Sequence, residues 1–120
     1  MAQAPNDVQR ASGMPVLGLG TWQNTDPDAC ANAVTTALET GYRHVDTAKR
    51  YGNEDLVGEG IAAADVPRED VFLATKVWFE DLAREDVLES ARTQLDDLGV
   101  DAVDLLYVHW PAGAYDPAET

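Results

Sequence analysis

Four side chains of this sequence could together deliver a proton to a carbonyl oxygen: Asp46, Tyr51, Lys76 and His109. A tyrosine hydroxyl, with an ordinary pKa of about 10, donates a proton slowly near neutral pH, but an adjacent ammonium such as Lys76 stabilises the phenolate and brings that pKa closer to working pH. Asp46 would keep a buried ammonium charged and in place, and His109 would offer a nitrogen to the carbonyl oxygen. These residue types predict carbonyl reduction, in which a proton meets the oxygen as hydride reaches the carbon.

Three of these residues come at the ends of short apolar segments that we predict to be strands. The predicted strands are Met14 to Leu19, Tyr42 to Asp46, Val71 to Lys76 and Val103 to His109. Taken singly, each polar ending has an ordinary structural explanation, such as a surface ion pair or a half-buried histidine. The chain has only two Lys and two His, however, so that one of each at a strand end favours a functional site.

Segments with helical periodicity separate the strands. The first helix is predicted from the capping residues Thr25, Asp26 and Pro27 to a stop at Gly41. The second covers Asn53 to Ala64, and the third covers Leu82 to Leu98, with the apolar stripe Val87, Leu88, Ala91, Leu95 and Leu98 and a stop at Gly99. Alternating strands and helices at this spacing predict right-handed βαβ units and a parallel sheet.

Two architectures are compatible with this alternation, an open doubly wound sheet and a (β/α)₈ TIM barrel. The open sheet favours a glycine-rich turn that opens the first helix, whereas Gly18 and Gly20 lie in the first predicted strand and Trp22 follows. A barrel places its functional residues where the strands end, which is where Asp46, Lys76 and His109 stand. We therefore predict the first half of a barrel, with the chain truncated after the fourth strand.

The charge balance excludes several classes of partner. The chain has 22 acidic and 8 basic residues, a formal net charge of −14, so we expect neither nucleic acid nor an anionic membrane as a partner. The excess of Asp and the scarcity of Lys resemble proteins of salt-loving organisms, the alternative being an ordinary acidic protein. No apolar run approaches the roughly 18 residues of a spanning helix, and the first ten residues lack a secretory signal, so we expect a cytoplasmic protein.

The remaining polar and reactive side chains receive structural interpretations. We expect His44 to lie one layer below the mouth of the barrel, Lys49 to be solvated, and the single cysteine, Cys30, to be part of the core. One cysteine and two histidines provide no metal site.

Four stretches of the sequence give it a resemblance to the aldo-keto reductase family, above all to its 2,5-diketogluconate and aldehyde reductase-like members. The stretches are Gly18 to Trp22, Gly41 to Ala48 with Tyr51-Gly52-Asn53-Glu54, Ala74 to Trp78, and Val103 to Pro111. The resemblance implies a catalytic tetrad of Asp46, Tyr51, Lys76 and His109, with Tyr51 as the proton donor.

The same resemblance implies the ligands. Family members reduce aldehydes, ketones and keto-sugars with NADPH, less often with NADH. Gly20, Thr21, Trp22 and Asp46 would lie against the nicotinamide and its ribose, and Trp22, Trp78, His109 and Trp110 would contact the substrate.

The sequence departs from the family in length. A barrel needs about 250 residues, whereas a polar segment over residues 1–13 and barrel elements over 14–120 provide four strands, and Asp116 to Glu119 resemble the start of a further helix. We therefore expect a fragment that is inactive alone, because the contacts to the cofactor phosphates and adenine lie in the second half. The alternative is a short binding or assembly module without redox turnover that pairs its open sheet edges with a missing second half or with a copy of itself.

Overall fold

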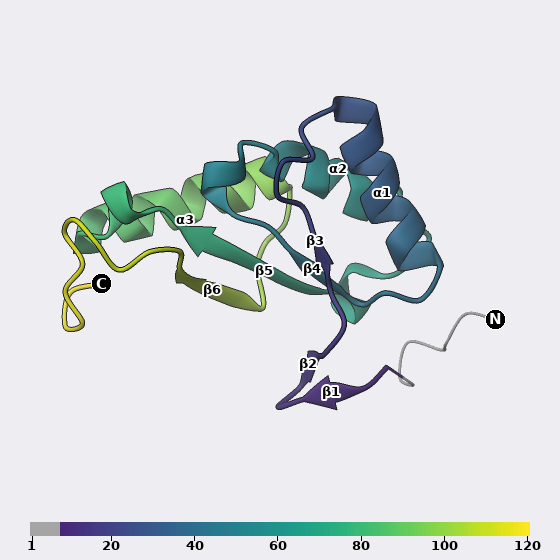
Figure 1. Ribbon diagram of the computed structural model, residues 1–120, viewed down its shortest axis with the longest axis horizontal. Helices are drawn as coiled ribbons and strands as arrows, with labels where there is room; N and C mark the ends of the chain where they lie inside the picture. Colours follow the sequence, from purple (N-terminus) through teal and green to yellow (C-terminus); the bar gives the residue numbers. More distant parts are fainter. Residues whose placement is uncertain (1–7) are drawn as a thin grey trace.

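A computed structural model describes residues 8–120 as an α/β fold in which helices alternate with a parallel sheet (Figure 1). The sheet has the strand order β3-β4-β5-β6, every neighbouring pair is parallel, and α1, α2 and α3 connect the strands in turn. The strands are β3 (Leu19–Gly20), β4 (His44–Asp46), β5 (Phe72–Val77) and β6 (Leu105–Val108). Strands in chain order with their helices on one face are typical of a barrel segment and not of a doubly wound sheet.

The chain before β3 forms a hairpin, which corrects the expectation of a single strand from Met14 to Leu19. Strand β1 (Arg10–Ala11) pairs with the antiparallel strand β2 (Met14–Pro15), and the chain leaves this pair before it enters β3. The turn residues Ser12 and Gly13 have φ values of 51° and 84°. Two positive φ values in a two-residue turn match the right-handed twist of paired strands, which is why the chain reverses here. Residues 1–7 lie outside the described part.

The predicted helices are confirmed, with ends within about two residues of those expected. Helix α1 (Pro27–Glu39) begins after Asp26, whose carboxylate accepts a 2.9 Å hydrogen bond from the Ala29 amide. Helices α2 (Glu54–Ala63) and α3 (Arg84–Leu98) follow, and Gly99 ends α3 with a φ of 69°. Within residues 8–120, no helix is long and apolar enough to cross a membrane.

The core lies between the sheet and the three helices. Its fully buried members include Cys30, Val34, Val45 and Leu73, so the core position expected for Cys30 is confirmed. Helix α2 approaches the end of α3 closely at Gly58, where an added Cβ would stand 2.2 Å from the Leu98 carbonyl oxygen. Only glycine fits this contact, and it holds the two helices at their observed distance.

The burial of α3 and β6 differs from the sequence expectation. On α3, Leu88 of the predicted apolar stripe is exposed, whereas the polar side chains of Ser90 and Gln94 are buried. Strand β6, expected to be covered on both faces, leaves Leu105 and Tyr107 more than one third exposed. Among residues 8–120 it pairs only with β5, so its other edge has no neighbouring strand.

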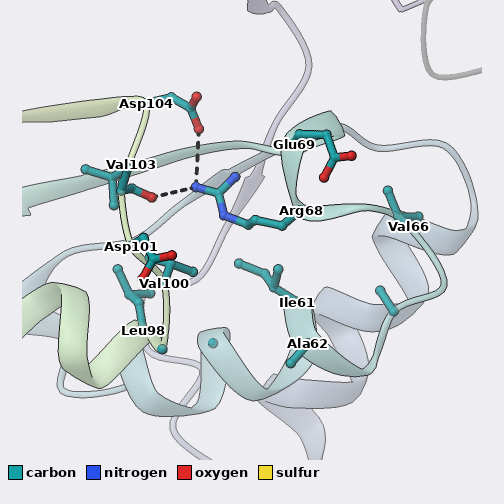
Figure 2. A pocket seen from close by; sticks show the side chains of 14 residues that line it. Ile61, Ala62, Val66, Arg68, Glu69, Leu98, Val100, Asp101, Val103 and Asp104 are labelled. Carbon is teal, nitrogen blue, oxygen red and sulfur yellow. Dashed lines mark hydrogen bonds and ion pairs between the residues drawn. The ribbon is translucent and has the colours of Figure 1, made fainter.

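At the end of the sheet where β5 and β6 begin, Arg68 bridges a hollow of about 570 Å³ (Figure 2). Its guanidinium donates to the carbonyl oxygens of Val71 at 2.6 Å and Ala102 at 2.9 Å, and it pairs with Asp104 at 3.5 Å. The Asp104 carboxylate also accepts a 2.8 Å hydrogen bond from the Leu73 amide. Arg68 therefore ties the start of β5 to the segment that leads into β6.

Candidate active site

The opposite end of the sheet gathers the four residues that the sequence predicts to be catalytic. Asp46 is the last residue of β4, Lys76 lies near the end of β5, and His109 follows β6 directly. Lys76 Nζ donates to Asp46 Oδ2 at 2.7 Å and to Tyr51 Oη at 3.1 Å. The backbone carbonyl of Thr47 accepts the third hydrogen bond of the ammonium, at 3.0 Å.

Tyr51 reaches this group from a loop and not from a strand end. It is the last residue of the short helix η2 (Lys49–Tyr51), and Gly52 turns the chain away with a φ of 69°. The Tyr51 ring stands nearly perpendicular to the His109 ring, with 5.7 Å between the centroids. The Tyr51 side chain thus contacts an ammonium through its hydroxyl and an imidazole through its ring.

Lys76 is held as a buried cation, since only 7% of the residue is exposed. Burial alone would lower the pKa of its ammonium, but the hydrogen bonds to Asp46 and Tyr51 and the charge of Asp46 outweigh it and raise that pKa above the ordinary value. Lys76 therefore carries its positive charge throughout the neutral range.

His109, in contrast to Lys76, is held in its uncharged form. Burial, followed by the neighbouring charge of Lys76, lowers the pKa of its imidazole below 6.5, so the ring is uncharged at neutral pH. The ring packs edge-on against Trp78, with 5.3 Å between the centroids. Its Nδ1 is buried and has no hydrogen-bond partner among residues 8–120.

A second tyrosine, Tyr107, joins the group although the sequence analysis did not single it out. Its hydroxyl donates to Asp46 Oδ1 at 2.8 Å, and its ring centroid lies 5.2 Å from Lys76 Nζ. Burial, and then the hydrogen bond to Asp46, raise the pKa of this phenol, so it remains a donor. Strand alternation offered the signal, because Tyr107 precedes His109 by two positions and so shares its face.

A buried polar cluster lies behind Lys76, between β5 and the helices, and it too was missed. Gln94 Nε2 donates to the Lys76 carbonyl at 3.0 Å and to Glu54 Oε2 at 3.0 Å, and Thr75 Oγ1 donates to the same Glu54 oxygen at 2.7 Å. Burial raises the pKa of Glu54 in spite of these hydrogen bonds. The cluster fixes the backbone at Lys76, which explains why polar residues are buried on α3.

The residues expected against the cofactor lie beside Asp46. Thr21 is buried and donates from Oγ1 to the Asp46 carbonyl at 3.0 Å, while the buried Asn53 amide donates to the Thr21 carbonyl at 2.8 Å. Gly20 has open space where a Cβ would stand, and Trp22 is 68% exposed. The open space at Gly20 lies near the exposed Trp22 indole and the Asp46 carboxylate. These groups fit a nicotinamide ring, which an indole can contact, and its ribose, whose hydroxyls a carboxylate can accept hydrogen bonds from.

A cavity of about 440 Å³ opens beside Tyr51 and His109, the two tetrad residues that line it. It is lined by Trp22, Arg50, Tyr51, Trp78 and His109, which includes three of the four residues expected to contact substrate. The fourth, Trp110, is 63% exposed on the adjoining loop and is not among the lining residues, so its role stays a prediction.

The two polar residues given structural interpretations lie outside this cavity. His44 Nδ1 is 3.0 Å from the Pro15 carbonyl oxygen, and its ring packs edge-on against Phe72, as an interior structural histidine would. Lys49 is exposed, as expected, and makes a surface ion pair with Asp81.

Comparison with known proteins gives concordant findings. Residues 16–120 match the model of the Aldo/keto reductase family. The chain is 49% identical over 105 residues to glycerol 2-dehydrogenase (NADP(+)) of Saccharomyces cerevisiae, a match covering 88% of the chain and 32% of that protein. It is similar to the crystal structure of an aldo-keto reductase from a Medee basin deep-sea metagenome library, with a TM-score of 0.79 and 48% identity over 83% of this chain and 36% of that one.

A Bombyx mori aldo-keto reductase in complex with NADP also matches, with a TM-score of 0.78 and 37% identity over 89% of this chain and 38% of that one. The expected fold class is thus confirmed, as a part of the barrel. The chain spans between 31% and 43% of the length of the curated relatives that it matches.

Proposed function

Because the chain belongs to the aldo/keto reductase family, we propose that the protein containing it reduces aldehydes, ketones or keto-sugars to alcohols with NADPH, and less readily with NADH. One observation carries the proposal: a buried ammonium, Lys76, is hydrogen-bonded at once to the carboxylate of Asp46 and the hydroxyl of Tyr51. A binding module has no chemical need for a cation beneath a phenol.

Tyr51 is the proton donor in this proposal. When its proton moves to the carbonyl oxygen, the phenolate left behind lies 3.1 Å from Lys76 Nζ, which stabilises the new negative charge. Asp46 keeps that ammonium charged and in place, and Tyr107 occupies the other carboxylate oxygen. Lys76 therefore stabilises Tyr51 more strongly in the transition state, where the phenolate forms, than in the ground state, and this difference is what accelerates the reaction.

His109 orients the substrate. Its imidazole is uncharged at neutral pH, so an N–H of the ring can donate to a carbonyl oxygen without competing with Tyr51 as an acid. Trp22 and Trp78 provide aromatic walls around the same cavity. Together these side chains would place the oxygen beside the Tyr51 hydroxyl and exclude water from it.

The cofactor's nicotinamide end would be held by Gly20, Thr21, Trp22 and Asp46, and when bound it supplies the hydride for the carbonyl carbon. Two matches support NADP over NAD, the NADP(+)-dependent yeast dehydrogenase and the silkworm enzyme in complex with NADP. The relatives are more than twice as long as the matched segment, so we propose that turnover requires the rest of the barrel and that residues 1–120 alone are inactive.

The test is Tyr51→Phe in the full-length protein, with Tyr42→Phe, two residues before β4, as the matched control. We expect the rate of NADPH-dependent aldehyde reduction to fall roughly 10²- to 10⁴-fold in Tyr51→Phe, the usual contribution of a general acid, with little change in the Kd for NADPH. The control should keep the wild-type rate. An unchanged rate in Tyr51→Phe would exclude this residue as the donor.

A further inference from the structure

We propose that Arg50 binds a carboxylate on the substrate, so that the site selects carbonyl compounds carrying this anionic group a short carbon chain away from the reacting carbon. The inference rests on the proposed reductase function and specifies its substrate class. Arg50 immediately precedes Tyr51 in η2 and lines the same cavity as Tyr51 and His109. A positive charge thus stands at the entrance to the site where the carbonyl would be reduced.

The guanidinium lies close to the reacting group, in a cation–π contact with an indole. Arg50 Cζ lies 5.4 Å from the centroid of the Trp78 ring, and that ring lies 5.3 Å from the His109 ring on which the carbonyl oxygen would rest. The indole is itself fixed, because Trp78 Nε1 donates to Glu80 Oε1 at 3.2 Å. Arg50 and His109 therefore contact the same indole, and one small molecule could contact both.

The donors of Arg50 remain available for a ligand. A cation–π contact with an indole does not require the N–H groups of a guanidinium as hydrogen-bond donors, so they can still pair with the two oxygens of a carboxylate. Among residues 8–120, no hydrogen bond or ion pair engages the Arg50 guanidinium. Its neighbour Lys49, by contrast, is paired with Asp81.

The acidic charge of the chain makes a cation at this cavity notable. With a net charge of −14, residues 1–120 repel an approaching anion, and a neutral aldehyde needs no cation in the cavity. A cation at the entrance attracts a carboxylate locally, in contrast to the surrounding acidic chain. The competing explanation is a solvated surface arginine that merely covers Trp78.

The test compares two aldehydes that differ in charge, 4-carboxybenzaldehyde and its methyl ester. The full-length protein and three variants, Arg50→Gln, Arg50→Lys and Lys49→Gln, are assayed at low ionic strength for kcat/KM with each aldehyde and for the KM of NADPH. The ratio of the two kcat/KM values, divided by the same ratio for the wild type, cancels the intrinsic reactivity of the aldehydes. Lys49→Gln is the matched control, since it removes an equal charge from the adjacent residue, which does not line the cavity.

We expect Arg50→Gln to lower the normalised ratio about 10- to 100-fold, as for the loss of a charge-assisted hydrogen bond. Arg50→Lys should restore part of the ratio, because it keeps the positive charge but lacks the paired N–H donors of a guanidinium. Lys49→Gln should keep the ratio within about twofold. Reduction of both aldehydes with an unchanged ratio in Arg50→Gln would overturn the inference and leave the proposed function standing. Equal loss for both aldehydes with a raised KM for NADPH would also overturn it, by placing Arg50 on the cofactor. Failure of the wild type to reduce either aldehyde would remove the proposed function, and the inference with it.

Discussion

Replacing Lys76 with methionine removes the ammonium that contacts Asp46 and Tyr51 while it keeps most of the side-chain volume. The structure sets the size of the expected effect. At the observed 3.1 Å between Nζ and the Tyr51 oxygen, a full negative charge on that oxygen is stabilised by about 5 kcal/mol at an effective dielectric constant of about 20. Since roughly half of that charge has developed in the transition state, the contribution to the rate is about 2 to 3 kcal/mol, or about 10²-fold, and it approaches 10⁴-fold for complete transfer.

The assay is the initial rate of NADPH oxidation at saturating aldehyde, followed by absorbance in the full-length protein. Lys76→Met also leaves the Asp46 carboxylate without its ion pair, and within residues 8–120 the carboxylate then keeps only the hydrogen bond from Tyr107. The double variant Lys76→Met/Asp46→Asn removes that stranded charge. If the ammonium acts by stabilising the phenolate, the double variant is as slow as Lys76→Met.

Two results would refute this reasoning. A loss of less than about tenfold in Lys76→Met would mean that the ammonium contributes little to proton transfer. A double variant that recovers the rate of Asp46→Asn alone would mean that the loss came from an uncompensated carboxylate and not from the missing cation.

Three further predictions concern Tyr107, Glu54 and the acidic surface. Tyr107→Phe removes the 2.8 Å hydrogen bond to Asp46 and should lower kcat about 10-fold with an unchanged circular dichroism spectrum; an unchanged kcat would show that Lys76 alone positions Asp46. Burial raises the folded-state pKa of Glu54 above its ordinary 4.5, so stability falls as pH rises through that pKa, and charged Glu54 costs stability at neutral pH. Glu54→Gln, which keeps an acceptor for Thr75 and Gln94, should therefore raise the free energy of urea unfolding more at about pH 7.5 than at about pH 5, and the reverse order would contradict the assignment. If the acidic surface is adapted to salt, the unfolding temperature should rise as KCl increases from about 0.1 M to about 2 M, because salt screens the self-repulsion of 14 net charges; a fall would refute the adaptation.

Helix ends were the most predictable part of the fold, because they depend on local chemistry. Asp26 and Pro27 at the start of α1, and Gly99 at the end of α3, act through their own backbone and capping groups. The hairpin before β3 was missed because Ser12 adopts a positive φ that its residue type does not require. Its strands have only two residues each, too few for a hydrophobic periodicity that a sequence pattern could detect.

The site was predictable where one rule, functional residues at strand ends, places several rare residue types together. That rule predicted Asp46, Lys76 and His109 at one edge of the sheet, whereas Tyr51, predicted from its residue type and the family resemblance, reaches the site from η2. The burial of Gln94 and Glu54 was not predicted, because an analysis of hydrophobic periodicity assigns every polar residue to the exposed face. Their burial depends on hydrogen bonds between positions 40 residues apart, which only the tertiary fold creates.

The bridge that Arg68 forms to Val71, Ala102 and Asp104 has a consequence for how this protein could diverge. It fastens β5 to the segment entering β6 at the end of the sheet remote from Tyr51, so the strands keep their alignment without help from the loops that surround the cavity. Mutations in those loops, including exchanges at Arg50 or Trp78, can therefore accumulate with little loss of structural integrity. Substrate preference could therefore change through substitutions in the loops around the cavity while selection preserves the Arg68 bridge at the opposite end of the sheet.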